Sequence, residues 1–421
     1  MSITSSFYSA LSGMDSNGIA LQVIADNISN SHTVGFKGST VHFEDILGMS
    51  LEGVGGANRL GVGATVSTIA CNFTQGTMST TGVGTDLALN GKGFFILEDP
   101  TSATQFYTRA GNFHMDSNGY LVSPNAQRVQ GYLYDPAGIN LIETLADIRV
   151  DQTDMIAPAV SSEVEITLNL DSEGTAKVFD IVNPGTTSNY STALTIYDAL
   201  GQAHTITVYF TKVAQQDWDW NALIDGSDVS GGVAGIPELF GTGGTEFTTS
   251  GLLSNTTPQS FHTEAITFAN GIAAAIPMTV DFTGTTQYGA PSAVQSIHQD
   301  GYAAGIISGI AINQEGNVVG HYTNGIVRDI ARLALADFPS VYGLERAGSM
   351  LFKATPASGD PLVNKPGEAG LGDISASMLE ESNVDLAAEF IKMIITQRAY
   401  QANTKIISTT DEMLAQLLSI K

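Results

Sequence analysis

Apolar residues recur with alternating spacings of four and three at both ends of the chain. Near the start, the repeat runs through Phe7, Leu11, Met14, Gly18, Leu21, Ala25 and Ile28. Near the end, the same register holds Leu386, Phe390, Met393, Tyr400, Ile407, Leu414 and Leu418. Such a seam is typical of a helix that packs along another helix. The pattern predicts one helix in residues 1–30 and another in residues 380–421.

The second of these helices carries more apolar surface than one partner can cover. A further stripe is offset around the cylinder and consists of Ile391, Ile395, Ala402, Ile406, Met413, Leu417 and Ile420. A helix that is apolar along two faces is packed on several sides. We therefore predict that both helices pack in an assembly. The alternative is an intramolecular two-helix hairpin.

The predicted assembly positions form one group in each helix. In the N-terminal helix they are Phe7, Leu11, Met14, Leu21 and Ile28. In the C-terminal helix they are Leu386, Phe390, Ile391, Met393, Ile395, Tyr400, Ile406, Ile407, Leu414, Leu417 and Leu418. Gly13 and Gly18 lower the propensity of the first helix further. The hypothesis that follows is that both termini are disordered in the monomer and fold when copies stack.

Between the two helices the chain has the pattern of short strands. Ile206, Val208 and Phe210 alternate after the turn at residues 198–201, and Met278, Val280 and Phe282 alternate likewise. A second hairpin turn is predicted at residues 116–119, where Asn118-Gly119 ends the turn. Residues 31–75 are rich in glycine and predict a long irregular arm. The middle of the chain is expected to be all β.

The order of these patterns predicts a nested chain of mixed α and β class, with two all-β domains of barrel or sandwich type. The expected parts are a terminal helical domain (1–30 with 380–421), a Gly-rich linking arm (31–75 with 362–379), an inner β domain (76–148 with 299–361) and an inserted outer β domain (149–298). Both terminal helices attach to the same body. They are therefore expected to pair as an antiparallel coiled coil.

Charge narrows the range of partners. The chain has 42 acidic and 17 basic residues, and its net charge is −25. Phosphate backbones and anionic membranes would be repelled, so nucleic acid is an unfavoured partner. No run of about 18 apolar residues is present, so membrane insertion is not expected. The first residues lack the basic start and continuous apolar run of a secretory signal, and we expect that no signal peptide is cleaved.

No motif for catalysis, metal binding or cofactor binding stands out in the sequence. The seven histidines are scattered, and Cys71 is the single cysteine, so neither a disulfide framework nor a metal-ligand cluster is expected. Gly53-Val54-Gly55-Gly56 lacks the third glycine of the dinucleotide fingerprint, and Gly91-Lys92-Gly93 lacks the Ser or Thr of a phosphate loop. We expect no enzyme, no cofactor and no metal.

The two ends of the chain resemble the terminal motifs of the bacterial flagellar rod and hook protein family. Asp26-Asn27-Ile28-Ser29-Asn30, followed by Val34-Gly35-Phe36-Lys37, is similar to the family's Asn-Asn-Ile/Leu-Ala-Asn and Thr-Gly-Phe-Lys. Residues 381–386 and 397–403 resemble the matching C-terminal motif. The residues that match are Asn27, Asn30, Gly35, Phe36, Lys37, Asn383, Gln397, Arg398 and Tyr400.

The resemblance implies a function. Rod members are shorter and lack a large middle insertion, whereas hook members have one, and residues 197–204 are similar to the hook members' own middle motif. A structural subunit is therefore expected that polymerises into a curved tube, a universal joint which transmits torque from rod to filament. The implied partners are copies of itself, the rod, hook-cap, hook–filament junction and hook-length control proteins, and the type III export apparatus. The implied location is the extracellular hook.

Two other functions stay open from the sequence. A distal rod protein is also structural but would lack the middle domain. A secreted β-rich adhesin would share the Thr- and Gly-rich strands but would not need two heptad termini. An enzyme is the least favoured interpretation.

Overall fold

The structure is a computed structural model that describes residues 3–47, 61–135, 138–151, 155–254, 259–260, 266–270, 273–274 and 278–419. The chain divides into two compact units. Unit 1 contains residues 1–152, 309–321 and 327–421, and unit 2 contains residues 153–308 and 322–326. None of the described helices is long and apolar enough to cross a membrane.

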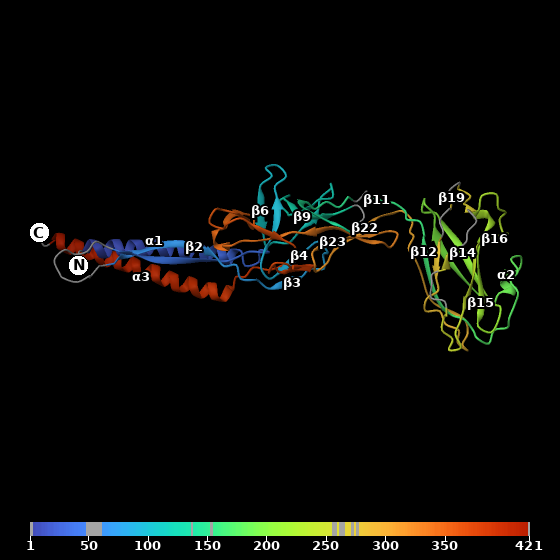
Figure 1. Ribbon diagram of the computed structural model, residues 1–421. Helices are drawn as coiled ribbons and strands as arrows, with labels where there is room; N and C mark the ends of the chain where they lie inside the picture. Colours follow the sequence, from blue (N-terminus) through green and yellow to red (C-terminus); the bar gives the residue numbers. More distant parts are fainter. Residues whose placement is uncertain are drawn as a thin grey trace. The chain divides into compact units, whose positions relative to one another are not determined.

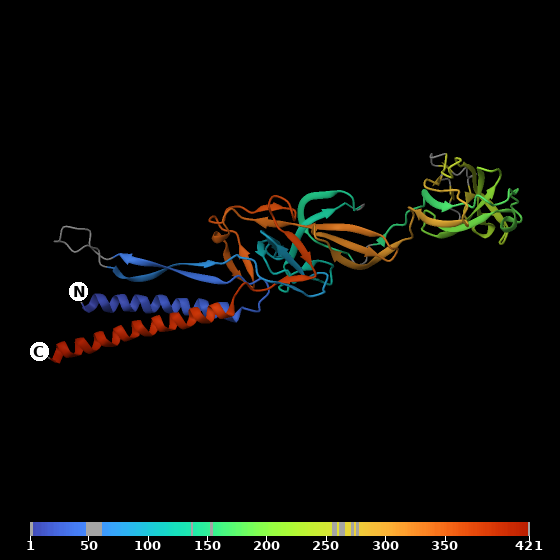
Figure 2. The same ribbon diagram turned by 90° about the horizontal axis from the view of Figure 1, so that it is seen from below.

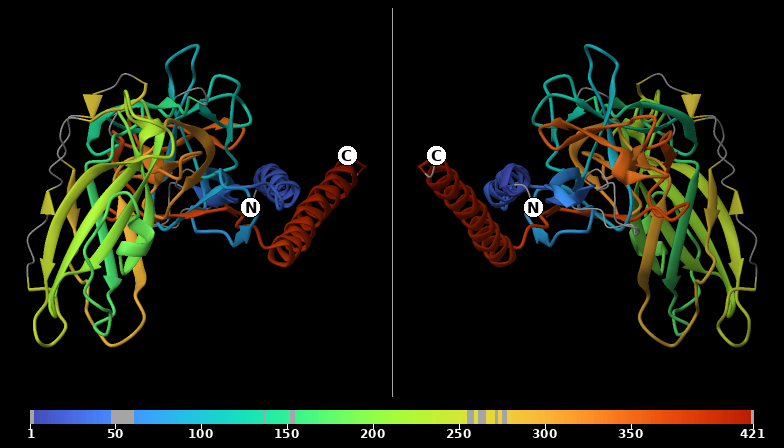
Figure 3. Two further views of the ribbon diagram at one scale, coloured as in Figure 1. Left: turned by 90° about the vertical axis from the view of Figure 1, so that its right-hand side faces the viewer. Right: turned by 90° about the vertical axis from the view of Figure 1, so that its left-hand side faces the viewer.

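The two long helices of unit 1 lie where the heptads predict them. Helix α1 (Ile3–Ser29) and helix α3 (Leu386–Ser419) lie side by side and run in opposite directions (Figures 1 and 2). In Figure 3, α1 is seen almost end-on and α3 slants past it. The Thr404 hydroxyl lies 3.6 Å from the Met14 sulfur, so the predicted seam of α1 contacts α3.

The opposite side of α1 packs against a β-hairpin. Strands β1 (Ser39–Leu47) and β2 (Gly61–Cys71) are antiparallel, with irregular register at two places. Ser16 Oγ donates a hydrogen bond of 3.0 Å to the Ala64 carbonyl of β2. The arm that the glycines predicted as irregular is therefore regular over these two ranges, because backbone pairing and the α1 surface stabilise it. Residues 48–60, with four of those glycines, lie outside the described part.

The buried stripe of α1 faces this hairpin. Ser16, Ala20, Ile24 and Asn27 are buried and follow one another at spacings of four, four and three. Ser16 bonds to β2, and Asn27 bonds to the first residue of β1. The larger heptad residues of α1 are only half-buried. A stripe of small and polar residues is therefore the most covered face of the helix, which a count of large apolar residues does not detect.

The β domain of unit 1 is built from segments on both sides of unit 2 in the sequence. Its main run of hydrogen-bonded neighbours is β23 (Asn317–Tyr322), β24 (Val327–Leu333), β9 (Arg128–Tyr134), β5 (Phe94–Glu98), β6 (Gln105–Thr108), β27 (Leu351–Lys353) and β26 (Glu345–Gly348). Strands attached to this run are β7 (His114–Met115), β8 (Leu121–Val122), β10 (Leu141–Asp147), β25 (Leu335–Asp337) and β28 (Leu362–Asn364). The predicted turn at residues 116–119 joins β7 to β8, and Gly119 has a φ of +81°.

Two small antiparallel pairs connect the N-terminal part of this domain to the segment that precedes α3. Strand β4 (Leu87–Asn90) pairs with β29 (Asp373–Ala376), and β3 (Met78–Thr80) pairs with β30 (Met378–Glu380). An aromatic cluster of Phe94, Tyr107, Phe338 and Phe352 lies in the core, where the rings meet mostly edge to face. A short 3₁₀ helix, η2 (Val341–Gly343), adjoins it. Cys71 is half-buried against this cluster.

Unit 2 contains two four-stranded sheets that share one core. The first has the order β17 (Gln259–Ser260), β20 (Thr279–Asp281), β12 (Glu163–Asn169) and β21 (Ala293–Gln299). The second is a meander of β13 (Tyr190–Tyr197), β14 (Ala203–Lys212), β15 (Asp217–Asp225) and β16 (Pro237–Glu246). Smaller elements are β11 (Met155–Ile156), β18 (Ile266–Thr267), β19 (Ala273–Ala274), α2 (Pro184–Thr187) and η1 (Gly226–Asp228), while β22 (Gly305–Ile312) continues into unit 1.

The core of unit 2 follows the alternation in the sequence. Ile206, Val208 and Phe210 of β14 are buried together with Val164 and Ile166 of β12, so residues of both sheets belong to one cluster. Period-2 alternation places such residues on one face of a strand. The four-residue helix α2 departs from the expectation of an all-β middle. Pro184 at its start fixes a backbone angle that suits a first helical turn.

Candidate functional site at the base of the terminal helices

Gly35 begins a tightly packed junction between the terminal helices and the β domain. It follows the turn after α1, has a φ of +68° and donates its N–H to the Glu380 carbonyl at 2.7 Å. A Cβ at this position would lie 2.5 Å from the backbone nitrogen of Ala110. Both the backbone angle and the space therefore require glycine here.

A buried ion network lies two residues further on. The Lys37 ammonium donates to Glu380 Oε1 at 2.6 Å and to the Thr74 carbonyl at 2.8 Å. The Arg109 guanidinium lies 3.5 Å from the other carboxylate oxygen, Glu380 Oε2. The Lys37 and Glu380 side chains are 0% exposed. One carboxylate therefore joins the segment after α1 to strand β30 and to the loop after β6.

Burial has an electrostatic consequence for the two cations. It lowers the pKa of Lys37, and the Glu380 carboxylate partly offsets this effect. The pKa of Arg109 is lowered for the same reason, again with an opposing contribution from Glu380. Arg109 gains further support from the Gly91 carbonyl at 2.8 Å and from the Phe94 ring at 5.3 Å. Two cations thus share one buried anion, so loss of the carboxylate would leave Lys37 without an anion and Arg109 with only the smaller contribution of Asp337.

Two asparagines of the terminal motifs bond to backbone groups on both sides of this network. Asn27 donates to the Ser39 carbonyl and accepts from the Ser39 N–H, each at 2.8 Å, and it also donates to Glu389 of α3 at 3.2 Å. Asn383 accepts from the Gly38 N–H at 2.8 Å and donates to the carbonyls of Asn72 and Thr74. α1, β1, β2 and the start of α3 are therefore joined by side-chain amides.

Arg346 closes the junction from the β domain. Its guanidinium donates to the Lys37 carbonyl, lies over the Phe36 ring at 5.2 Å and lies 3.9 Å from the Asp26 carboxylate. Arg346 belongs to β26, whose turn to β27 has Ser349 at a φ of +51° and the next residue at +61°. Two left-handed residues match the type I′ turn of a two-residue hairpin, at a cost when neither is glycine.

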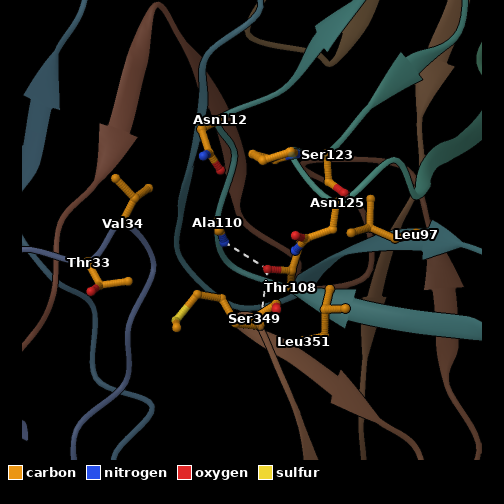
Figure 4. A pocket seen from close by; sticks show the side chains of 12 residues that line it. Thr33, Val34, Leu97, Thr108, Ala110, Asn112, Ser123, Asn125, Ser349 and Leu351 are labelled. Carbon is orange, nitrogen blue, oxygen red and sulfur yellow. Dashed lines mark hydrogen bonds between the residues drawn. The ribbon is translucent and has the colours of Figure 1, made fainter. Parts of the chain in front are cut away.

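A cavity of about 300 Å³ adjoins this hairpin. Figure 4 shows the side chains around it, which come from several segments of unit 1. Among them are Thr33 and Val34 after α1, Thr108 and Asn112 near β6, Ser123 and Asn125 after β8, and Ser349 from the strained turn. Thr108 Oγ1 donates to the Met350 carbonyl at 2.9 Å and accepts from the Ala110 N–H at 3.0 Å. Among the described residues, no group of three or more His, Cys, Asp or Glu could hold a metal ion.

The structure brings together only some of the predicted site residues. Asn27, Gly35, Phe36, Lys37 and Asn383 all lie in the junction. Asn30 is next to it, where it donates to Asp26 at 3.0 Å and accepts from Thr33 at 3.1 Å. Gln397, Arg398 and Tyr400 lie on the exposed surface of α3 instead.

The assembly positions divide by helix. In α1, Phe7, Leu11, Met14, Leu21 and Ile28 are half-buried. In α3, the exposed ones are Leu386, Phe390, Ile391, Ile395, Tyr400, Ile406 and Leu414, and the half-buried ones are Met393 and Ile407. Leu417 and Leu418 belong to α3, but their side chains lie outside the described part.

Three residues of the junction were not predicted from the sequence. Glu380 stands one position before the C-terminal motif, and Arg109 and Arg346 lie outside both terminal motifs. The signal for the ion network was Lys37, which is the single Asp, Glu, Lys or Arg in residues 27–43. Such a lysine requires an acidic partner if it is buried.

Replacing Gly35 tests the close packing at the junction. Gly35→Ala should lower the free energy of unfolding by about 2–5 kcal/mol, because backbone strain and overpacking add. The control is Gly82→Ala. Gly82 has a φ of +75°, but no atom lies within 4 Å of the place that a Cβ would take, so only the strain of about 1–2 kcal/mol applies. Equal losses in urea unfolding would contradict the packing argument.

Replacing Glu380 tests the ion network. Glu380→Gln should lower the free energy of unfolding by about 3–5 kcal/mol, because the buried carboxylate that both cations share is then lost. The neighbouring Glu381 is half-buried and accepts one hydrogen bond, from the Ser79 hydroxyl at 2.7 Å. Glu381→Gln should cost about 1 kcal/mol. Urea unfolding of both variants measures the difference, and similar costs would contradict the role of Glu380.

Four family models match successive parts of the chain. Their descriptions are "Flagella basal body rod protein" at residues 7–37, "Flagellar hook protein FlgE/F/G D1 domain" at 88–162, "Flagellar basal body protein FlaE D2 domain" at 167–302 and "Flagellar basal body rod FlgEFG protein C-terminal" at 375–420. The first match contains the Gly35 and Lys37 side of the junction, and the last contains Glu380 and Asn383.

Relatives that match over almost their whole length are named flagellar hook protein FlgE. The chain is 34% identical to the flagellar hook proteins FlgE of Borreliella burgdorferi and of Treponema pallidum, with 99% of each chain covered. It is 32% identical to FlgE of Salmonella typhimurium, over 99% of this chain and 100% of the relative. The crystal structure of Helicobacter pylori flagellar hook protein FlgE2 matches with a TM-score of 0.51 at 16% identity, covering 72% of this chain and 100% of that one. That crystal structure has a similar fold.

The chain belongs to the flagellar hook protein family, and its function is that of a structural subunit of the hook rather than that of an enzyme.

Proposed function

We propose that this subunit polymerises with copies of itself into a curved tube, the universal joint between rod and filament, and that the terminal helices line its inner wall. The observation that carries the proposal is the exposed apolar surface of α3. Ile391 is 60% exposed and Ile395 is 63% exposed, although both are large aliphatic side chains. Contiguous apolar surface of this kind marks a protein interaction site.

The position of α1 explains why α3 lacks cover. α1 lies between α3 and the β1–β2 hairpin, so α3 contacts α1 along only one of its sides. Burying a large apolar side chain stabilises by about 1.5–3 kcal/mol. Helices of neighbouring copies would supply this burial at each of the predicted assembly positions of α3. The predicted coiled-coil seam and the second stripe would then both be packed, each against a different helix.

The junction suits the transfer of torque from the helices to the outer parts. In this proposal residues 1–30 and 380–421 form the helical inner domain, and the ion network ties them to the inner β domain at 76–148 and 299–361. Residues 31–75 with 362–379 form the link that bends, and residues 149–298 form the outer domain. A torque applied to the helices would act in part through Lys37, Glu380 and Asn383, whose bonds join segments more than 300 residues apart.

The proposal extends to partners and location. The hook ends would contact the rod, hook-cap and hook–filament junction proteins, and a hook-length control protein would act during growth. Type III export without a cleaved signal peptide would deliver the subunit to the extracellular hook. Marginal terminal helices, as the sequence predicts, would suit this route, since such a chain is easier to keep unfolded in a narrow channel.

Substitution on α3 tests the assembly role. The double variant Ile391→Ser, Ile395→Ser should abolish hooks in a strain deleted for this gene, because the inter-subunit apolar surface is lost. Negative-stain images should show basal bodies without hook or filament, while urea unfolding of the purified variant should match the unchanged chain. Gln401→Ser, at an exposed polar position of the same helix, is the control and should restore hooks. Normal hooks from the double variant would contradict the proposal.

Hydrogen exchange tests whether the helices gain stability from neighbours. Amides of residues 5–28 should exchange rapidly in the dilute monomer and slowly in the polymer, because neighbouring helices supply the missing burial. Amides of β14, where Ile206, Val208 and Phe210 are buried in the core of unit 2, provide the control and should be protected in both states. Strong protection of residues 5–28 in the monomer would show that α1 does not depend on assembly.

A further inference from the structure

Two segments connect the sheets of unit 2 to the rest of the chain. Residues 155–162 lead into β12, and residues 300–306 follow β21. The two segments run antiparallel, since β11 pairs with β22 and Ala159 forms an isolated bridge with Tyr302. We call these two segments the root ribbon. The covalent path between unit 1 and the sheets of unit 2 runs along both strands of this ribbon.

Side chains bond the two strands together where the root ribbon meets the first sheet. Asp300 Oδ1 accepts from the Ser162 N–H at 2.7 Å and from the Glu163 N–H at 3.0 Å, and Asp300 Oδ2 accepts from the Ser162 hydroxyl. Next to this pair, Gln299 Oε1 accepts from the Ser161 hydroxyl at 2.7 Å. These bonds lie at the end of the β12–β21 ladder that is nearest to the ribbon, so they reinforce its first pairs.

Ser161 also joins the root ribbon to the second sheet. The residue is 2% exposed, and its hydroxyl accepts from the Tyr197 N–H at 3.0 Å as well as donating to Gln299. The Ser161 N–H donates to the Tyr197 carbonyl at 3.0 Å, and Tyr197 ends β13. A Cβ at Gly301 would overlap the Ser161 hydroxyl, so the packing here is close. One buried hydroxyl therefore connects both strands of the ribbon with the second sheet.

The turn between β13 and β14 packs against the same ribbon. Gly201 in this turn has a φ of +79°. A Cβ there would lie 2.7 Å from the Pro158 Cβ and 3.2 Å from the Ala303 Cα, which belong to different strands of the ribbon. The buried Asp198 carboxylate holds the turn, since it accepts from the Gln202 N–H at 2.8 Å. The stretch that is similar to the hook members' middle motif thus lies at the root of unit 2.

We propose that these contacts form a mechanical clamp, through which unit 2 resists unfolding when force enters along the root ribbon. The clamp consists of Ser161, Ser162, Gln299 and Asp300, together with residues 197–201. A force that pulls two antiparallel strands apart from one end breaks their hydrogen bonds one after another, so the bonds nearest that end are loaded first. A cluster of bonds at this place delays every later step, and the lifetime of a protein under force depends on its unfolding rate.

This inference rests on the proposed function, because that function supplies the force. In a curved tube that rotates about its own axis, each copy passes from the inside of the bend to the outside once in every turn. Bending stretches one strand of a two-stranded ribbon and compresses the other, so strands that are not joined slide and separate. The clamp joins the two strands to each other and to both sheets, so that unit 2 would follow the motion of its root without unfolding.

Pulling on the two ends of the full-length chain tests the clamp. Handles are attached through Ser2→Cys and Lys421→Cys in a Cys71→Ser background. Because unit 1 contains segments from both sides of unit 2, it has to unfold first, and only then does the force reach the two ends of unit 2. The second transition in a force trace therefore measures the unfolding of unit 2 when it is loaded along its root ribbon.

Ser161→Ala should raise the unfolding rate in the second transition about tenfold at a fixed force, because two hydrogen bonds next to the loaded end are lost. Thr285→Val is the matched control. Thr285 is also 2% exposed, and its hydroxyl donates to the Ile166 carbonyl at 3.2 Å and accepts from the Leu168 N–H at 3.4 Å, farther along β12. Both variants should lose stability in urea, which imposes no direction on unfolding, but Thr285→Val should leave the rate under force nearly unchanged.

The glycine of the turn provides a second pair of variants. Gly201→Ala should raise the unfolding rate under force, because its Cβ would push the turn away from the root ribbon. Gly231→Ala is the control, since Gly231 has a φ of +84° but no atom lies within 4 Å of the place that a Cβ would take. Backbone strain is therefore present in both variants, and only Gly201→Ala disturbs the clamp.

The outcomes separate this inference from the proposed function. Equal unfolding rates under force for Ser161→Ala and Thr285→Val would overturn the clamp, and equal rates for the two glycine variants would overturn the part of the turn in it. Either result comes from the monomer and would leave the hook function intact. Failure of the unchanged chain to restore hooks would contradict the function itself.

Discussion

The bond between Lys37 and Glu380 is the interaction on which unit 1 depends. An isolated buried charge is unfavourable, and here the Glu380 carboxylate compensates the charges of both Lys37 and Arg109. The three side chains come from the segment after α1, the strand before α3 and a loop of the β domain. Because both cations need the one carboxylate, the segments that carry the three side chains are held together at both ends of the β domain.

The closely bonded junction contrasts with helix α3 further along, where part of the apolar surface is uncovered. α1 has cover from the hairpin on one side and from α3 on the other, whereas α3 presents Phe390 and Ile394 to the surroundings. An apolar face without cover is a cost for a single molecule and an advantage for a polymer, since each added copy buries it. In the proposed polymer, the closed junction would transmit force and the open helix surface would bind neighbouring copies.

Periodicity along the sequence predicted the elements better than their partners. The heptads located α1 and α3, and the alternation at Ile206, Val208 and Phe210 gave the inward face of β14. The β1–β2 hairpin was not expected, because glycines obscured its strand pattern and its stability comes from contact with α1. The ion network could not be derived from spacing, since the partners are brought together by the tertiary fold alone. The motif residues show the same limit: Asn27 and Asn383 could be recognised as motif members, but their bonds to Ser39 and Gly38 involve backbone groups, which carry no residue-specific signal.

The separation of Lys37 from Glu380 along the chain has a consequence for timing. Ribosomes make every chain from its amino end, so the first residue of this pair exists long before the second. A further 343 residues must be synthesised after Lys37 before its anion, Glu380, is present. Until then the early segments lack the contact that would commit them to a final shape, and contacts of such long range form slowly. In a nascent chain, unit 1 therefore lacks the bond that closes it until the chain is almost complete.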